Sequence, residues 1–293
     1  MSDRLTPLER LRQSGVTPDR ALGQNFLIDP NILDVIERMA ELSQDDVILE
    51  VGPGAGVLTE RLIERCGFVH SVEVDRRLAA LLEAQFAVMP NFSLHEADAV
   101  RLPLGSLEPA PTKFVANLPY NVATPLVIKS LEELPALRLW CLMVQREIAD
   151  RLFARPGSAA YGGVSVMTQL MTRKLAARAV PDTVFYPRPR IRSSLLAFAR
   201  RGDAERFTAR FAAIKAVVYC SFSHRRKTLV NSLAAAEPRL LPAALAGLEP
   251  PQRKRLVQEL LAGMGLAANI RPQQLTPEQY ARLEQAFVNV KKR

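Results

Sequence analysis

Hydrophobic and polar positions vary along residues 30–198 with a pattern that predicts strands and helices in turn. Short apolar runs such as residues 47–49 have the composition of strands buried in a parallel sheet. Segments such as residues 30–42 and 76–86 carry apolar residues at helical spacing. Strands are expected at residues 47–49, 68–75, 92–99, 113–116, 137–144, 174–179 and 195–198. This alternation is typical of an α/β fold with a mostly parallel sheet.

The first strand leads into a glycine-rich turn, Glu50-Val51-Gly52-Pro53-Gly54-Ala55-Gly56. Glycines just past a strand let the backbone turn sharply and approach a ligand closely. A dinucleotide-binding turn has the spacing G-x-G-x-x-G, but here the third glycine comes one residue earlier. A glutamate followed by glycines at alternate positions is a pattern associated with sites that bind S-adenosylmethionine (SAM). The alternative is a structural turn that binds no ligand.

Acidic residues follow the next two predicted strands. Glu73 lies 21 residues after Gly52, where such folds place the acid that accepts hydrogen bonds from a ribose diol. Asp75 is expected to cap the helix that starts near Arg76, which leaves Glu73 for the ribose. Asp98 ends the third strand and could accept a hydrogen bond from an adenine amine. Lone acids at strand ends are common, so Asp98 indicates a site only together with its neighbours.

The tetrapeptide Asn117-Leu118-Pro119-Tyr120 follows the fourth strand, at the sheet edge where ligands of open α/β folds bind. An aromatic amine is a poor nucleophile because its lone pair is delocalised, so two acceptors must hold its hydrogens and turn the lone pair outward. The Asn117 side chain and a backbone carbonyl can supply them, and Pro119 restricts the backbone. Tyr120 offers a flat face for base stacking. The alternative is an ordinary Asn-x-Pro turn.

Two further segments combine polar and aromatic residues. Gln24 and Asn25 precede Phe26 and Leu27, and by themselves these amides could be ordinary loop residues. Residues 185–194 form a proline-rich loop in which arginines alternate with other residues after two aromatics. This composition suits a loop that contacts a flipped base and the phosphates near it.

The net charge of +9 is distributed unevenly along the 293 residues. Residues 203–293 contain 15 Lys and Arg against 7 Asp and Glu, whereas residues 1–202 contain 24 against 23. We therefore expect an N-terminal extension at 1–19, an α/β domain at 20–202, and a basic helical domain at 203–293. A basic domain of this kind suits the binding of a polyanion. Arg225, Arg226 and Lys227 are its RNA-binding candidates, and a solvated basic face is the alternative.

Several classes of protein are disfavoured. Cys66, Cys141 and Cys220 are far apart, and neither they nor the three histidines show metal-ligand spacing, so we expect reduced thiols and no metal. No apolar run reaches membrane length and no secretory signal is visible, so we expect a cytoplasmic protein that does not bind membranes.

Taken together, these motifs resemble those of the small-subunit ribosomal RNA adenine dimethyltransferase family, from about residue 20 to the C-terminus. The resemblance rests on residues 22–27, 50–56, 117–120, 185–189 and 225–229. It implies a Rossmann-like SAM-dependent methyltransferase domain with a small all-helical C-terminal domain. It also implies dimethylation of N6 of two adjacent adenosines in the 3′-terminal hairpin of 16S rRNA, in an immature small (30S) subunit. We expect a monomer.

The resemblance assigns roles to individual residues. For the cofactor, Asn25 and Leu27 would contact the methionine end of SAM, with Gly52 and Gly54 beside it, Glu73 on the ribose and Asp98 on the adenine. For the target base, Asn117 would lie where cofactor and amine meet, next to Pro119, and Tyr120 and Phe185 would sandwich the flipped adenine. Arg225, Arg226 and Lys227 would contact RNA. The methyl group would move by direct in-line displacement, without a covalent enzyme intermediate.

Two positions depart from the family pattern. Glu96-Ala97 precedes Asp98 where a glycine is usual, and Arg192 stands where an aspartate is common. These departures affect the local turn and the RNA contacts rather than the reaction.

Three alternatives stay open. The first is a sister enzyme that dimethylates large-subunit rRNA and confers macrolide resistance, although Leu118 and residues 225–227 favour the small subunit. The second is a non-catalytic ribosome-assembly or transcription factor on the same fold. The third, a nicotinamide-dependent oxidoreductase, is disfavoured by the glycine spacing.

Overall fold

A computed structural model of the protein describes residues 9, 15, 17–18 and 24–291. These residues form two compact units. The first runs up to Ala149 and is completed by Arg173–Arg200, whereas the second contains Asp150–Thr172 and the chain from Arg201 onward. The expected extension at residues 1–19, and Leu22 and Gly23 of the first motif, lie outside the described residues apart from residues 9, 15, 17 and 18.

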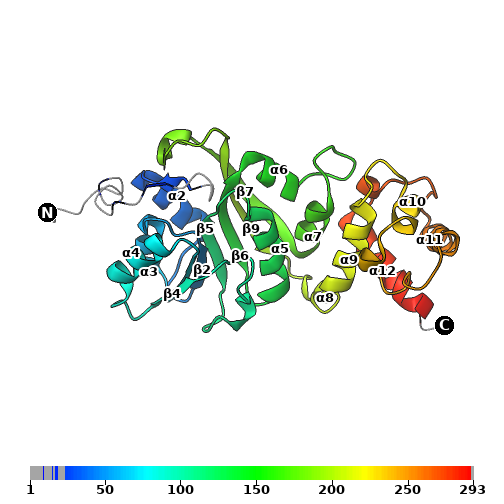
Figure 1. Cartoon of the computed structure of the whole chain (residues 1–293), viewed down its shortest axis with the longest axis horizontal. Helices are drawn as coiled ribbons and strands as arrows, with labels where there is room; N and C mark the ends of the chain where they lie inside the picture. Colours follow the sequence, from blue (N-terminus) through cyan, green and yellow to red (C-terminus); the bar gives the residue numbers. More distant parts are fainter. Residues whose placement is uncertain (1–8, 10–14, 16, 19–23, 292–293) are drawn as a thin grey trace. The chain divides into compact units, whose positions relative to one another are not determined.

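The first unit is built on a seven-stranded sheet with the strand order β4-β3-β2-β5-β6-β9-β7 (Figure 1). The strands are β2 (Val47–Val51), β3 (Phe68–Glu73), β4 (Phe92–Glu96), β5 (Lys113–Asn117), β6 (Leu139–Gln145), β7 (Thr172–Val180) and β9 (Ser193–Arg200). The pairs from β4 to β6 are parallel, and β9 runs antiparallel to β6. This architecture confirms the expected α/β fold with a mostly parallel sheet.

Burial explains why the central strands were visible in the sequence. In β2 and β6 all but one residue of each strand is buried, which requires the continuous apolar runs seen there. The edge strand β7 is different, because only its two end residues are buried. Its exposed residues include three cations, which discourage pairing with another strand edge.

Helices connect the strands, and a short ribbon adds a second sheet. The helices are α2 (Pro30–Ala40), α3 (Val57–Arg65), α4 (Arg76–Phe86), α5 (Ala123–Glu133) and α6 (Arg146–Leu152). The ribbon pairs β1 (Phe26–Leu27) with β8 (Phe185–Tyr186), so that Phe26 lies opposite Tyr186 and Leu27 opposite Phe185. Two motifs far apart in the sequence are thus hydrogen-bonded to each other.

Acidic side chains cap the starts of two helices in this unit. The Asp29 carboxylate accepts a hydrogen bond from the Asn31 amide, and Pro30 is the first residue of α2. The Asp75 carboxylate accepts from the Arg77 amide at the start of α4, as expected.

The strand order reverses between β2 and β5. From β2 the chain proceeds to β3 and β4 on one side, and then crosses to β5 and β6 on the other. At such a switch point the connections leave in opposite directions and open a crevice at the carboxyl ends of the strands. The glycine-rich turn after β2 and the tetrapeptide after β5 meet there.

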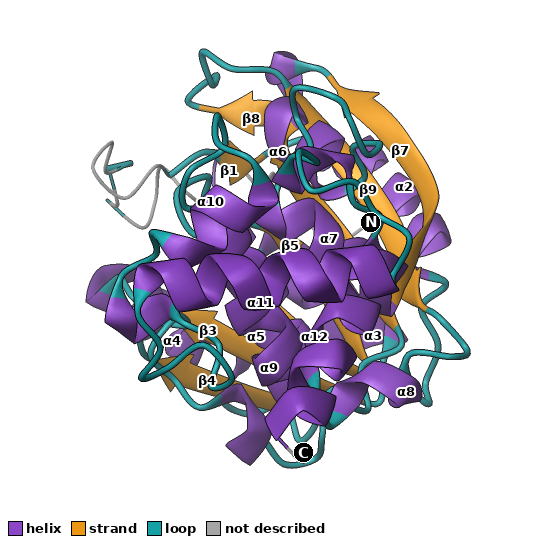
Figure 2. Cartoon of the chain, turned by 90° about the vertical axis from the view of Figure 1, so that its right-hand side faces the viewer, coloured by secondary structure: helices purple, strands orange, loops and turns teal. Residues whose placement is uncertain are grey.

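The second unit is formed mainly by helices, drawn in purple in Figure 2. They are α7 (Gly163–Met171), α8 (Glu205–Thr208), α9 (Phe211–Phe222), α10 (Leu229–Ala234), α11 (Pro250–Gly263) and α12 (Pro277–Lys291). The all-helical character expected for residues 203–293 is present in α8 to α12. Because α7 packs against α9 and α12, residues 150–172 belong to this unit, whereas they were expected in the α/β domain at residues 20–202.

No described helix has the length and apolarity needed to cross a membrane. The three cysteines are buried and unpaired. Among the described residues, no group of three or more His, Cys, Asp or Glu side chains is placed to hold a metal ion.

Candidate functional site

The glycine-rich turn is held in a conformation that requires glycine. Gly52, Gly54 and Gly56 have φ angles of 71°, 61° and 79°, in the left-handed region. A Cβ on Gly52 would lie 3.1 Å from Pro119 Cδ, and one on Gly54 would lie 2.7 Å from the Phe26 ring. The turn is therefore packed against the tetrapeptide on one side and β1 on the other, with no room for side chains.

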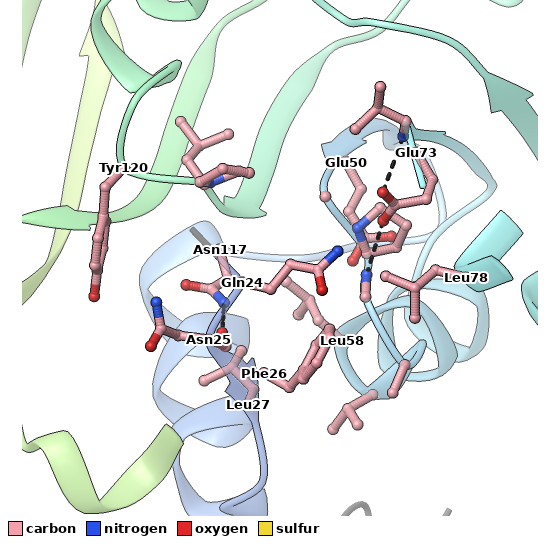
Figure 3. Close-up of a pocket in the computed structure, with 18 residues that line it drawn as sticks. Gln24, Asn25, Phe26, Leu27, Glu50, Leu58, Glu73, Leu78, Asn117 and Tyr120 are labelled. Carbon is pink, nitrogen blue, oxygen red and sulfur yellow. Dashed lines mark hydrogen bonds between the residues drawn. The ribbon is translucent and has the colours of Figure 1, made fainter. Parts of the chain in front are cut away.

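These three segments enclose a cavity with an empty volume of about 720 Å³, including its open mouth (Figure 3). Its walls are residues 24–27, the turn and start of α3, and residues 117–120, with Glu73, Val74 and Leu78 closing one end. Of the expected cofactor residues, Asn25, Leu27, Gly52, Gly54, Glu73 and Asn117 all line this cavity.

Glu73 is fixed by backbone amides. One carboxylate oxygen accepts hydrogen bonds from the Val74 and Asp75 amides at 2.9 and 3.0 Å, and the other accepts from the Gly54 amide at 3.3 Å. The side chain is buried, which raises the pKa of Glu73, and these hydrogen bonds act in the opposite direction. The second oxygen has one long hydrogen bond and is suited to accept from a ligand hydroxyl.

Asp98 lines a second cavity of about 460 Å³, which shares Gly52, Glu73, Val74 and Pro119 with the first. One Asp98 oxygen accepts from the Val100 amide at 2.9 Å, and the side chain is 43% exposed. Val74 is 54% exposed although it is a large apolar residue. Sequence reasoning missed Val74, whose apolar side chain directly after the acid was the available signal.

The Asn117 side chain has a defined orientation. Its amide nitrogen donates to the Asn25 carbonyl at 3.0 Å, the dashed line in the lower half of Figure 3. The Asn117 side-chain oxygen accepts no hydrogen bond from a described residue and is left as an acceptor. The contact explains why Asn25 and Asn117, on segments far apart in the sequence, belong to one site.

Tyr120 is anchored by a residue that the sequence did not single out. Its hydroxyl lies 2.7 Å from the Ser193 hydroxyl at the start of β9. Burial raises the pKa of Tyr120, while the hydrogen bond to Ser193 lowers it. The ring is thereby held at the cavity wall formed by residues 117–120.

Glu50 contributes a buried carboxyl group to the same cavity, outside the expected set of site residues. One of its oxygens accepts from Thr59 at 2.8 Å and from Ser71 at 2.6 Å, whereas the other is buried without a hydrogen-bond partner among the described residues. Burial raises the pKa of Glu50 to about 7. A buried acceptor without a partner at a cavity wall is a natural contact for a ligand donor.

Of the residues expected to contact the cofactor or the target base, Phe185 is the one that the structure does not bring to either cavity wall. It is 2% exposed and belongs to the same hydrophobic cluster as Leu27. The neighbouring Tyr186 is 41% exposed. A stacking role for Phe185 stays a prediction.

The expected RNA-binding cations lie in the second unit and differ among themselves. One Arg225 nitrogen donates to the Ala159 and Tyr161 carbonyls at 2.9 and 2.7 Å. Arg226 and Lys227 are exposed. Arg225 therefore ties two loops of this unit together, a role that no sequence pattern indicated.

Fold and site together define a Rossmann-like methyltransferase, with a ligand cavity at the switch point of the sheet. A sequence model described as "Ribosomal RNA adenine dimethylase" matches residues 17–245, which is more than half of the chain. A relative from Rubrobacter xylanophilus, named ribosomal RNA small subunit methyltransferase A, is 41% identical over 266 residues, covering 91% of this chain and 94% of that protein. The chain belongs to the ribosomal RNA adenine dimethylase family.

Solved structures have the same fold. A dimethyladenosine transferase from Plasmodium falciparum matches with a TM-score of 0.72 at 23% identity, covering 90% of this chain and 98% of that one. The 23S rRNA methyltransferase ErmE matches with a TM-score of 0.61 at 26% identity, covering 90% and 100%. The first of these likenesses supports the fold alone.

Proposed function

We propose that the protein uses SAM to dimethylate N6 of two adjacent adenosines in the 3′-terminal hairpin of 16S rRNA, in an immature small ribosomal subunit. The observation that carries this proposal is the orientation of Asn117, whose nitrogen is engaged by the Asn25 carbonyl so that its oxygen can accept from an amine. The name of the Rubrobacter relative supports the small subunit as the substrate.

The cavity residues fit SAM. The buried Glu50 oxygen that has no hydrogen-bond partner among the described residues suits an ammonium group, and the second oxygen of Glu73 suits a ribose hydroxyl. Asp98 and Val74 would receive the adenine, and Asn25, Leu27, Gly52 and Gly54 the methionine end. When bound, SAM supplies a methyl group already activated by the sulfonium.

The chain's own contribution is positioning. The Asn117 oxygen and a backbone carbonyl of residues 117–119 would hold the two hydrogens of the amine, and Pro119 keeps that backbone rigid. Tyr120 would stack on the flipped base while Ser193 fixes its ring. A pre-arranged acceptor needs no reorganisation during transfer, which is the main source of acceleration here.

The basic second unit would hold the RNA substrate. Arg226 and Lys227 of the second unit would contact RNA phosphates, and Arg225 would support their loop. The enzyme would act as a monomer in the cytoplasm, where small subunits are assembled.

The test is transfer of tritiated methyl groups from SAM to immature small subunits, followed by mass spectrometry to map the modified bases. Replacing Asn117 by Ala should lower the rate about 10²–10³-fold, as removal of one pre-arranged polar group does in other enzymes. Asn289→Ala, on the exposed face of α12, is the control and should keep the wild-type rate. An unchanged rate for Asn117→Ala would contradict the chemical assignment.

The likeness to ErmE makes large-subunit rRNA the second candidate substrate. The same mapping experiment separates the two. Label on adjacent adenosines near the 3′ end of small-subunit rRNA supports the proposal, and label on a large-subunit adenosine replaces it.

A further inference from the structure

The near-neutral charge of residues 1–202 conceals a strongly basic segment. Residues 173–200 contain seven Lys and Arg against a single acid, Asp182. Residues 1–172 contain 16 Lys and Arg against 22 Asp and Glu, so an acidic remainder cancels the basic excess in the total. The excess of basic over acidic residues in the α/β unit therefore lies on β7 and on the segment from β8 to β9.

Most of these cations have no side-chain partner in the part of the chain that the structure describes. Arg200 is the exception, because its guanidinium donates to the Leu134 and Leu137 carbonyls and lies over the Trp140 ring. The others are exposed, and their side chains form no ion pair or hydrogen bond with any described residue: Arg173, Lys174, Arg178, Arg188, Arg190 and Arg192. Unpaired cations at this density favour a polyanionic partner.

Protection of the sheet edge explains only some of them. Cations on an edge strand discourage pairing with other strands, and this suffices for Arg173, Lys174 and Arg178 of β7. Arg188, Arg190 and Arg192 lie between β8 and β9, on no edge strand, so edge protection does not account for them.

Exposed apolar side chains lie among these arginines. Tyr186 and Ile191 are 41% and 47% exposed. Arginines interleaved with exposed aromatic and aliphatic residues suit an unpaired nucleic acid strand, whose bases stack while its phosphates are neutralised.

Hydrogen bonds connect this segment to the wall of the cavity. Ser193, which follows Arg192, anchors the Tyr120 hydroxyl at 2.7 Å, and the Arg192 carbonyl accepts from the Arg146 amide at 2.9 Å. At the other end, Tyr186 lies opposite Phe26, a residue of the cavity wall. Residues 186–192 thus begin beside one segment of the cavity wall and end beside Tyr120, the proposed stacking residue for the target base.

We propose that residues 186–192, here called the arginine loop, bind the unpaired RNA strand that flanks the target adenosine, with Arg190 and Arg192 on its phosphates and Tyr186 stacking on a base. This inference rests on the proposed function. It assigns Arg192, which stands where the family commonly has an aspartate, to substrate binding in this chain.

The test compares the double variant Arg190→Ala, Arg192→Ala with a matched control, Arg65→Ala, Arg76→Ala. The control also removes two arginines with exposed side chains from the first unit, at α3 and α4. The probe for binding is a synthetic RNA of the proposed 3′-terminal hairpin, titrated over a range of salt concentrations. Calorimetry with SAM verifies that each variant is folded.

The loop variant should bind the RNA at least tenfold more weakly at low salt, with the slope of log Kd against log salt smaller by about 1.4, or 0.7 per lost contact. KM for the RNA should rise with kcat little changed, and SAM affinity should stay at the wild-type value. The double variant Arg190→Lys, Arg192→Lys should have the salt slope of the wild type. A loop variant with the slope and KM of the control would overturn the inference.

Failure of the two proposals can be distinguished. If wild-type protein methylated no rRNA, the proposed function would be wrong and with it this reading of the loop. If the wild type were active and the loop variant matched the control, only the inference about the loop would be wrong.

Discussion

The cavity and the arginine loop belong to the same unit but hold their polar groups in opposite ways. In the cavity, Glu73 and Asn117 are fixed by backbone groups at 2.9–3.3 Å. In the arginine loop, the side chains of Arg190 and Arg192 are exposed and form no ion pair or hydrogen bond with any described residue. Group transfer needs acceptors held in one geometry, whereas capture of a flexible polyanion needs charge more than fixed geometry.

The largest expected effect concerns the cavity, where the polar groups are held in a fixed geometry. Gly54→Ala should destabilise the protein by roughly 2–5 kcal/mol, because the left-handed backbone costs about 1–2 kcal/mol and overpacking against Phe26 costs about 1–3 kcal/mol. It should also abolish measurable SAM binding in calorimetry. Gly157→Ala is the control, since Gly157 has φ +86° but open space around it, and it should cost only about 1–2 kcal/mol. Equal losses of stability for the two would show that the Phe26 contact is unimportant.

The buried carboxyl of Glu50 gives a pH dependence. Its pKa is raised to about 7, so its contribution to stability is fully present below the ordinary pKa of 4.5 and is lost as pH rises through 7. The loss could reach about 3 kcal/mol. In Glu50→Gln, thermal unfolding should depend less on pH between 5 and 7. If the wild type and the variant had parallel profiles, Glu50 would not titrate in this range.

The stacking residue should show a smaller effect. Tyr120→Ala should lower kcat/KM about ten- to a hundredfold, since stacking of one base contributes roughly 1–3 kcal/mol. Tyr120→Phe keeps the ring but loses the hydrogen bond to Ser193, so it should lie between Tyr120→Ala and wild type. Methyl-transfer kinetics with varied RNA concentration would measure both, and a Tyr120→Ala variant with wild-type kinetics would remove Tyr120 from the site.

The smallest expected effect separates two neighbouring cations of the second unit. Arg225→Lys should lower the free energy of unfolding by about 1 kcal/mol, because an ammonium replaces the guanidinium that bonds the Ala159 and Tyr161 carbonyls. Arg226→Lys keeps an exposed charge and should leave stability unchanged. Denaturant unfolding of both variants is the measurement, and identical curves would contradict the supporting role of Arg225.

Local signals in the chain identified most of the elements that position the cavity. The cap at Asp75 and the buried strands depend on residues close in sequence, and they were predicted correctly. The division between units was harder, because residues 150–172 join the second unit through packing of α7 on α9 and α12. Long-range packing of this kind leaves no local pattern in the sequence.

By itself, the sequence determined the fold class and the family, because glycine spacing, strand-end acids and the tetrapeptide at 117–120 are constraints of local backbone chemistry. Only the tertiary structure decided which groups meet: the Asn117 amide with the Asn25 carbonyl, Tyr120 with Ser193, and Arg225 with the 159–161 loop. It also showed that six of the seven cations of residues 173–200, all except Arg200, are exposed and have no side-chain partner among the described residues, which a total charge cannot reveal. The reason is physical: side-chain partners are set by packing between distant segments, whereas turns and strands are set by neighbouring residues.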